Sequence, residues 1–285
     1  MADELSLDEA DIEQFLLTRI KREDRDINGF VSDLIAFLSS QIYRQLRAAG
    51  PLSSLTSREA LRFFGGLESA IDDAGLPEKL ATLKDLFDLQ IALAKEEFVR
   101  TTGISRPPAL SADGRQYVPI FVGTRKEVVR QLVFKALGDV REGLVNRILS
   151  GDQQGLSDVE IVDNAVGRIS DALAKELKTS VAAFNRFVRQ DQMVKTDLQY
   201  VLYAGPKDER NRLFCAIRAR NVYTLQEVNT WDNGQGLPAN IYCGGYNCRH
   251  ELVPLSDALA DKLMKQRGLP GVNYYDYSHR GSGRQ

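Results

Sequence analysis

Apolar residues recur every three or four positions along most of the first two hundred residues, the spacing that places them on one face of an α-helix. Similar stripes run through residues 57–75, 77–98, 124–148 and 157–188. They predict long amphipathic helices whose apolar faces form a core, and they place the intervening Lys and Arg on solvated faces. The first stripe consists of Ile12, Phe15, Leu16, Ile20, Phe30, Val31, Leu34, Ile35 and Leu38.

Three short motifs mark expected helix starts: SLDE at 6–9, TRKE at 124–127 and SDVE at 157–160. Each has Glu three residues after Ser or Thr, the capping-box pattern in which each side chain bonds the other residue's backbone N–H. Because an apolar stripe follows each motif, we expect a helix to begin at each one.

Turn-forming residues are expected to interrupt this helical region once. Residues 101–123, TTGISRPPALSADGRQYVPIFVG, contain a Pro pair and an Asp-Gly pair, which favour turns. Within them, QYVPIFV can form at most an edge strand, because proline cannot donate to a sheet ladder. We therefore predict a helical region over residues 1–204 with a break at about 101–123.

The composition changes after residue 204. Residues 205–255 are rich in Gly, Asn and Pro and predict a compact, irregular module. Residues 256–285 predict a short helix and then a Gly-rich tail, whose Tyr274, Tyr275 and Tyr277 fit either disorder or docking onto a neighbour. The expected fold class is mainly α, with an elongated helical N-terminal region and a small irregular α+β C-terminal module.

Composition narrows the class of protein. A hydrophobic fraction of 43% and a charged fraction of 27% over 285 residues are ordinary for a globular protein. The net charge of −2 gives no bulk attraction to nucleic acid or to an anionic membrane. No apolar run approaches the roughly 18–20 residues of a membrane-spanning helix, and the acidic N-terminus lacks the basic start of a signal peptide. We expect a protein that is made and folded in a cytosol.

The three cysteines lie close together in the C-terminal module. Cys215, Cys243 and Cys248, with His250, supply the four ligands that tetrahedral zinc takes. In extended backbone, residues two apart face the same side, so Cys248 and His250 can share an ion. Packed reduced thiols, or a disulfide formed outside the cytosol, are the open alternatives. A catalytic thiol is disfavoured, because no residue that would orient a Cys–His pair is evident.

Basic residues cluster around Cys215: Lys207, Arg210, Arg212, Arg218 and Arg220. They can contact phosphates, pair with an acidic partner surface or stay solvated. The sequence contains no P-loop, no GxGxxG after a strand, no HExxH and no GxSxG motif. We therefore do not expect an enzyme.

Three segments in this module, GPKDERNRLFC, VYTLQEV and GGYNCRHELVPL, follow one another between residues 205 and 255. In this order they resemble the C-terminal domain of the phage Mu F-like minor head proteins, also called head morphogenesis proteins. The resemblance implies structural or binding roles for Arg212, Cys215, Cys243, Cys248, Arg249, His250 and Pro254.

The chain departs from the family at its ligand positions. Family members commonly read His, a few residues and then Cys-Arg-Cys, whereas this chain reads Cys243 and then Cys248-Arg249-His250. A metal site tolerates the exchange of a Cys and a His position, because the same set of ligands remains. A catalytic Cys–His pair does not tolerate it. The resemblance thus implies a structural zinc of the Cys₃His type. We expect Gly244-Gly245 to provide the bend that returns Cys243 toward Cys248 and His250.

The resemblance also implies a function. Minor head proteins are virion components that act in head morphogenesis and associate with the portal and the capsid interior. We therefore expect portal and capsid proteins, and other copies of this chain, as partners, with assembly in the host cytoplasm. DNA contact is a further expectation that the net charge does not support. The alternative is an effector or enzyme domain attached to phage head machinery.

Overall fold

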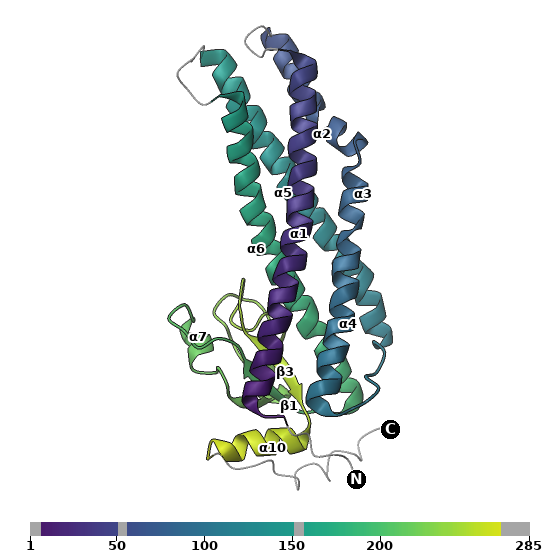
Figure 1. Ribbon diagram of the computed structural model, residues 1–285, viewed down its shortest axis with the longest axis vertical. Coiled ribbons are helices and arrows are strands. Elements are labelled where there is room, and N and C mark those ends of the chain that lie inside the picture. The colour runs from purple at the N-terminus through teal and green to yellow at the C-terminus, as the bar shows by residue number, and fades with distance from the viewer. Residues whose placement is uncertain (1–6, 51–55, 151–156, 269–285) are drawn as a thin grey trace. The chain divides into compact units, whose positions relative to one another are not determined.

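The computed structural model describes residues 7–50, 56–150 and 157–268 (Figure 1). Long helices precede a small three-stranded antiparallel sheet, which confirms the mainly helical fold class. The elements are α1 (Glu9–Ala49), α2 (Ser57–Asp73), α3 (Leu76–Ala81), α4 (Leu83–Thr102), α5 (Ala112–Ser150), α6 (Asp158–Thr196), β1 (Tyr200–Ala204), α7 (Leu213–Ala216), β2 (Val222–Thr224), α8 (Leu225–Asn229), α9 (Ala239–Tyr242), β3 (Glu251–Leu255) and α10 (Asp257–Gln266).

The chain forms two compact units, each assembled from separate stretches of sequence. The sheet unit comprises Met1–Lys21, Gln90–Arg115 and Val181–Gln285, and the helical unit comprises Arg22–Leu89 and Gln116–Ser180. Helices α1, α4, α5 and α6 contribute residues to both units. The predicted helical region up to residue 204 thus supplies part of each unit.

The core of the helical unit consists of the apolar stripes seen in the sequence. Ile27, Val31 and Leu34 of α1 are buried there, as are Val133 of α5 and Leu173 of α6. This is the arrangement that the three- and four-residue spacing predicts. Ion pairs join the helices, between Lys178 and Asp24 at the surface (2.9 Å) and between Arg125 and Glu176 in a partly buried position (2.7 Å).

Of the three expected capping boxes, the one at 157–160 is confirmed. The Ser157 hydroxyl accepts from the Glu160 N–H at 3.2 Å, and the Glu160 carboxylate accepts from the Ser157 N–H at 2.7 Å. Ser6 of the first box lies outside the described residues. At that end of α1, Asp8 and Asp11 accept from each other's N–H groups, at 2.8 and 3.0 Å. These two bonds satisfy backbone donors that have no partner within the helix.

The expected helix start at Thr124 is wrong. Thr124 falls inside α5, and its hydroxyl donates to the Ile120 carbonyl of the preceding turn at 2.9 Å. The QYVPIFV segment, for which the sequence allowed at most an edge strand, is helical and also part of α5. The break between α4 and α5 covers only residues 103–111. Phe121 is buried against Phe87, with ring centroids 5.4 Å apart. Burial of this aromatic side chain favours continuation of the helix and offsets part of the cost of the backbone donor that Pro119 lacks.

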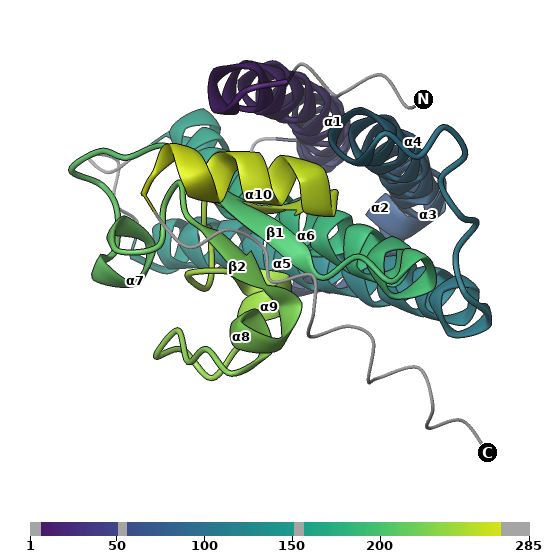
Figure 2. The ribbon, with the colours of Figure 1, turned by 90° about the horizontal axis from the view of Figure 1, so that it is seen from below.

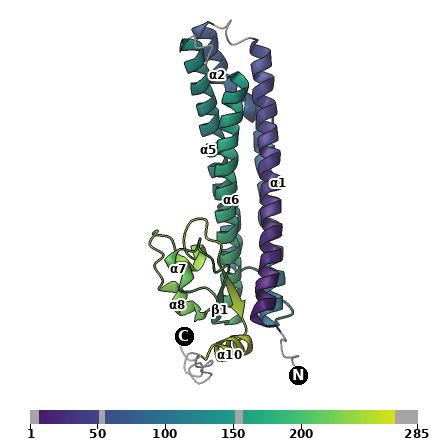
Figure 3. The same ribbon diagram turned by 60° about the vertical axis from the view of Figure 1, so that its left-hand side comes forward.

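In the sheet unit, both faces of the sheet are covered. The strand order is β2-β1-β3, and all pairs are antiparallel. One face packs on α10 and on Ile12 and Leu16 of α1 (Figure 2). The opposite face, which includes Val201 and Tyr203, packs on Phe98, on Met193 and on the cysteine-bearing segments (Figure 3). The burial of every residue in β1 follows from this two-sided packing.

Among the described residues, none of the helices combines the length and the hydropathy needed to span a lipid bilayer. The Tyr-rich tail after residue 268 lies outside the described residues. The helix predicted after residue 255 is α10, and the Ser256 hydroxyl caps it by accepting from the Leu259 N–H at 3.3 Å.

Candidate metal centre

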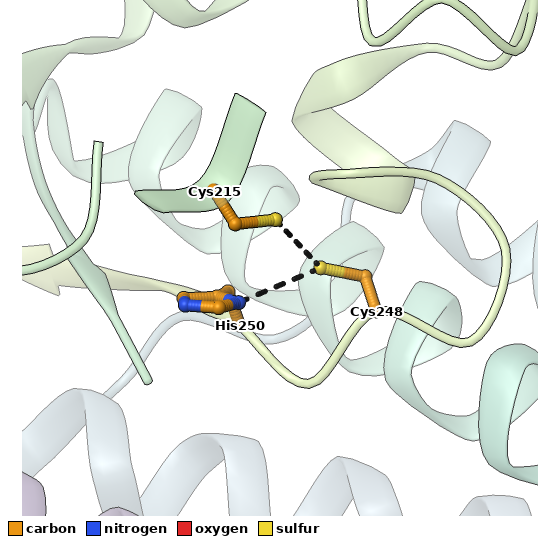
Figure 4. A group of neighbouring side chains, drawn as sticks. All are labelled: Cys215, Cys248 and His250. Carbon is orange, nitrogen blue, oxygen red and sulfur yellow. Dashed lines mark hydrogen bonds between the residues drawn. The ribbon is translucent and has the colours of Figure 1, made fainter. Parts of the chain in front are cut away.

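Three of the four predicted ligands meet at one point of the sheet unit. The Sγ atoms of Cys215 and Cys248 and a ring nitrogen of His250 all lie within 4.8 Å of one another (Figure 4). Cys215 comes from α7, Cys248 from the loop after α9, and His250 from the residue directly before β3. Cys215 and His250 are 2% and 1% exposed, so this group could hold a metal ion away from solvent.

Two of the three distances between these atoms match the edges of a tetrahedral zinc site, and the third is at most 4.8 Å. The two sulfurs are 3.7 Å apart, and Cys248 Sγ lies 3.8 Å from His250 Nδ1. With Zn–S and Zn–N bonds of about 2.3 and 2.05 Å, the edges of a tetrahedron are about 3.8 Å (S···S) and 3.6 Å (S···N). The same 3.7 Å is far longer than the ~2.0 Å of a disulfide bond, and all three cysteines are free thiols. This conformation therefore fits coordination and does not fit a Cys215–Cys248 disulfide.

His250 is oriented by its other ring nitrogen. Nε2 lies 2.9 Å from the carbonyl oxygen of Pro206, which can only accept, so Nε2 carries the proton. In a neutral ring, Nδ1 then has the free lone pair, and it faces Cys248. Metal-binding histidines are typically held by such a bond from the non-ligating nitrogen. Gly205 allows the backbone before Pro206 to lie against the His250 ring, because a Cβ on residue 205 would be only 2.7 Å from that ring.

Each of the two sulfurs accepts a hydrogen bond. The Tyr203 hydroxyl donates to Cys215 Sγ at 3.3 Å, and the Gly244 N–H donates to Cys248 Sγ at 3.3 Å. The contact with Cys215 lowers the pKa of the Cys248 thiol, and His250 lowers it further, while the same contact raises the pKa of Cys215. The thiolate, which is the metal-binding form, is therefore favoured at Cys248.

Cys243, the fourth predicted ligand, is fully buried but is not part of the three-atom group. Burial raises the pKa of its thiol well above the ordinary value. Its backbone has φ +49° and ψ −120°, which is unusual for a residue with a side chain. Such conformations cost energy and are commonly found at functional sites.

The two glycines after Cys243 have different roles. Gly245 has φ +99° and contributes to the bend, as expected, together with Cys243 itself. Gly244 instead permits close packing, because a Cβ there would lie 2.3 Å from Cys215 Sγ and 3.3 Å from Cys248 Sγ. The sulfurs thus pack directly against the bare backbone of Gly244.

The remaining residues singled out by the sequence brace this loop. Arg212 donates to the carbonyls of Gly244 (3.1 Å) and Tyr246 (2.8 Å), which ties the loop to the start of α7. Arg249 makes a bidentate pair with Asp208 at 2.7 and 2.6 Å. Pro254 lies in β3, which is an edge strand of the sheet, where a missing backbone donor is tolerated.

The basic cluster does not act as one group. Arg218 lies over the rings of Phe214 and Trp231, 3.9 and 4.7 Å from their centroids, so its charge is used in cation–π contacts. Arg220 pairs with Glu13 at 2.8 Å. Arg210 is exposed.

A cavity of about 480 Å³ lies within the sheet unit beside Arg220. Lys207 and Arg267 line it together with Glu13, and the rest of its wall comes from small and apolar side chains and Asn221. Lys207 and Arg220, two of the residues predicted as possible phosphate or partner contacts, therefore line the same cavity. Glu13 also lines it and already pairs with Arg220.

Sequence reasoning missed Tyr203 and Arg186. Tyr203 is fully buried, donates to Cys215 and stacks on His250 with ring centroids 5.1 Å apart. Arg186 of α6 is 3% exposed and donates to backbone carbonyls of the ligand-bearing segment. Neither residue is of a type that ligates zinc, so the Cys and His pattern gave no signal that assigns them to the site.

Comparison with known proteins adds no relative: no protein-family model, no curated protein and no solved structure matches this chain.

Proposed function

We propose that this chain is a minor head protein of a phage, a structural virion component whose C-terminal module is fastened by a zinc ion. The observation that carries the proposal is the convergence of the motif residues. Arg212, Cys215, Gly244, Cys248 and His250, which make the sequence resemble the Mu F-like module, all lie at or beside one metal-compatible group. A set of residues that converges in space has a shared physical role.

The burial of the site favours a structural metal over a catalytic one. Catalytic zinc keeps one coordination position open for water or substrate, whereas structural zinc is enclosed by protein ligands. Here two of the three grouped residues are nearly inaccessible, and Tyr203 and Gly244 cover the sulfurs. The role we propose for the module is therefore mechanical, and the protein acts without catalysis.

We propose Cys243 as the fourth ligand. Its thiol is fully buried, is close enough to Cys248 for a charge there to raise its pKa, and is close enough to Tyr203 for a hydrogen bond that lowers its pKa. A change of side-chain rotamer moves a cysteine sulfur by a few ångströms without moving the backbone. The completed site would be the Cys₃His type expected from the sequence.

Metal analysis tests the zinc part of the proposal. The purified chain is expected to hold one zinc per molecule, and Cys248→Ser and His250→Ala are expected to lose it. Cobalt substitution distinguishes the ligand sets, because the thiolate-to-cobalt band in the near ultraviolet grows with the number of thiolates. A weaker band in Cys243→Ser supports four ligands, whereas an unchanged band contradicts the role of Cys243.

Fractionation of infected cells tests the function. We expect the protein to sediment with portal-containing heads and with mature particles, as a partner of portal and capsid proteins. Recovery only as a free protein with a catalytic activity of its own would instead support an effector or enzyme domain attached to head machinery.

A further inference from the structure

A buried array of charges lies beside the metal group in the sheet unit. Arg186 and Arg189 of α6 are both buried, and so are Glu97 of α4 and Glu251 of β3. Arg189 bonds both carboxylates, Glu251 at 2.7 Å and Glu97 at 2.9 Å. Arg19 of α1 also pairs with Glu97. Buried charges are costly unless they are paired, and each member of this array has an oppositely charged partner within it.

Arg186 differs from the other two arginines in what it bonds. Its Nη1 donates to the carbonyl of Ile241 at 2.9 Å. Its Nη2 donates to the carbonyls of Cys248 (3.4 Å) and His250 and to the Glu251 carboxylate (3.2 Å). One guanidinium thus holds the backbone on both sides of the ligand-bearing loop, including the carbonyls of two of the three grouped residues.

A planar guanidinium suits this task. Its donors point in fixed directions, so it can hold several carbonyls in one geometry, whereas an ammonium group on a flexible chain acts as a single point. The three carbonyls are far apart in sequence from Arg186. That of Ile241 belongs to the short helix α9, and those of Cys248 and His250 lie in the loop between α9 and β3, which has no regular secondary structure. Arg186 therefore joins the end of this loop to the helix before it.

We propose that Arg186 is the positioning residue of the metal centre: it holds the 241–250 backbone in the conformation that brings Cys248 and His250 together for metal binding. This inference rests on the proposed zinc site and adds a residue outside its ligands. Residues that orient metal ligands typically change affinity by about 10–100-fold when they are replaced.

Arg189 provides a matched control. It lies on the same helix, is equally buried and bonds the same Glu251, but the bonds described for it go to carboxylates and not to carbonyls of the ligand-bearing loop. Arg186→Lys and Arg189→Lys both keep the positive charge and both disturb the array. Only Arg186→Lys removes the guanidinium N–H groups that donate to the carbonyls of the ligand-bearing loop.

The test compares zinc affinity, measured by competition with a chromogenic chelator, and cobalt spectra for the full-length variants. Circular dichroism verifies that each variant is folded under the assay conditions. We expect Arg186→Lys to bind zinc about 10–100-fold more weakly and to shift the cobalt bands, while Arg189→Lys keeps the wild-type affinity and spectrum.

Two outcomes overturn the inference while leaving the zinc site intact. In the first, Arg186→Lys binds zinc as tightly as the wild type. In the second, both variants lose the same affinity, which would mean that Arg186 acts only through general stability. A wild-type chain that binds no zinc overturns the metal site and the inference together. Arg186→Gln, which also removes the charge, gives an independent second measurement if the lysine variant does not fold.

Discussion

Replacing Gly244 with alanine tests the geometry of the metal centre with a single methyl group. The added Cβ would lie 2.3 Å from Cys215 Sγ, and ordinary contact begins at about 3.4 Å. Either the backbone at residue 244 or the Cys215 side chain must therefore move by about 1 Å. This is several times the ~0.2 Å within which metal–ligand distances are normally held. We expect Cys215 to be displaced from the coordination position.

The expected loss can be estimated. Structural zinc binds with an apparent free energy of about 10–16 kcal/mol, so one of four ligands accounts for roughly 2.5–4 kcal/mol, or about two to three powers of ten in affinity. The assay is chelator competition at fixed pH. Gly138→Ala in α5 is the control, because a Cβ there meets nothing within 4 Å. We expect it to keep the affinity and to stabilise the helix by about 0.5–1 kcal/mol. Wild-type zinc affinity in Gly244→Ala would refute the proposed packing of the sulfurs.

Three further predictions follow from the structure. At a free zinc concentration of about 1,000 times the Kd, bound zinc stabilises the folded protein by about 4 kcal/mol. Removing the zinc with a chelator should therefore lower the Tm of the sheet unit by about 8–16 °C in calorimetry, and an unchanged Tm would contradict a structural metal. Hydrogen bonds from Arg249 lower the pKa of Asp208 from 3.8 to about 2, so the pair stabilises the fold fully above about pH 3.8 and is lost as the pH falls through 2. Carboxyl chemical shifts should titrate near 2 and move toward 3.8 in Arg249→Gln, and an unmoved midpoint would exclude Arg249 as the cause. Leu213 and Ile217 are 78% and 59% exposed, so replacing both with Ser should change the free energy of unfolding by less than about 1 kcal/mol but reduce recovery with heads. Equal recovery would exclude this surface as a head contact.

The helical part of the fold could be predicted because its signal is periodic. Stripes such as Ile27, Val31 and Leu34 repeat over many turns, and no local feature outweighs them. The errors arose where a short motif was read alone. The TRKE motif satisfies the capping pattern, but Thr124 lies inside a helix whose packing at Phe121 extends it past Pro119.

The residues of the site could be predicted only where their type alone indicates metal binding. Cys215, Cys248 and His250 could be grouped because cysteine and histidine are rare in this chain. Spacing could not show that the Cys243 sulfur does not join the three-atom group in this conformation.

Arg186 and Arg189 were expected on a solvated face, and this expectation is wrong because their partners are distant in sequence. Glu97 and Glu251 neutralise them in the interior of the sheet unit. A charged residue in a helical pattern is usually exposed, and only tertiary pairing shows the exception. Buried arginines of this kind are therefore visible in a structure and not in a single sequence.

X-ray absorption at the zinc edge of the purified chain is the sharpest test of a structural zinc at this site, because it reports the elements and distances around the ion. We expect zinc with sulfur neighbours at about 2.3 Å and one nitrogen at about 2.0–2.1 Å, and fewer sulfur neighbours in Cys248→Ser. A chain without zinc, or zinc surrounded only by oxygen and nitrogen, would contradict it.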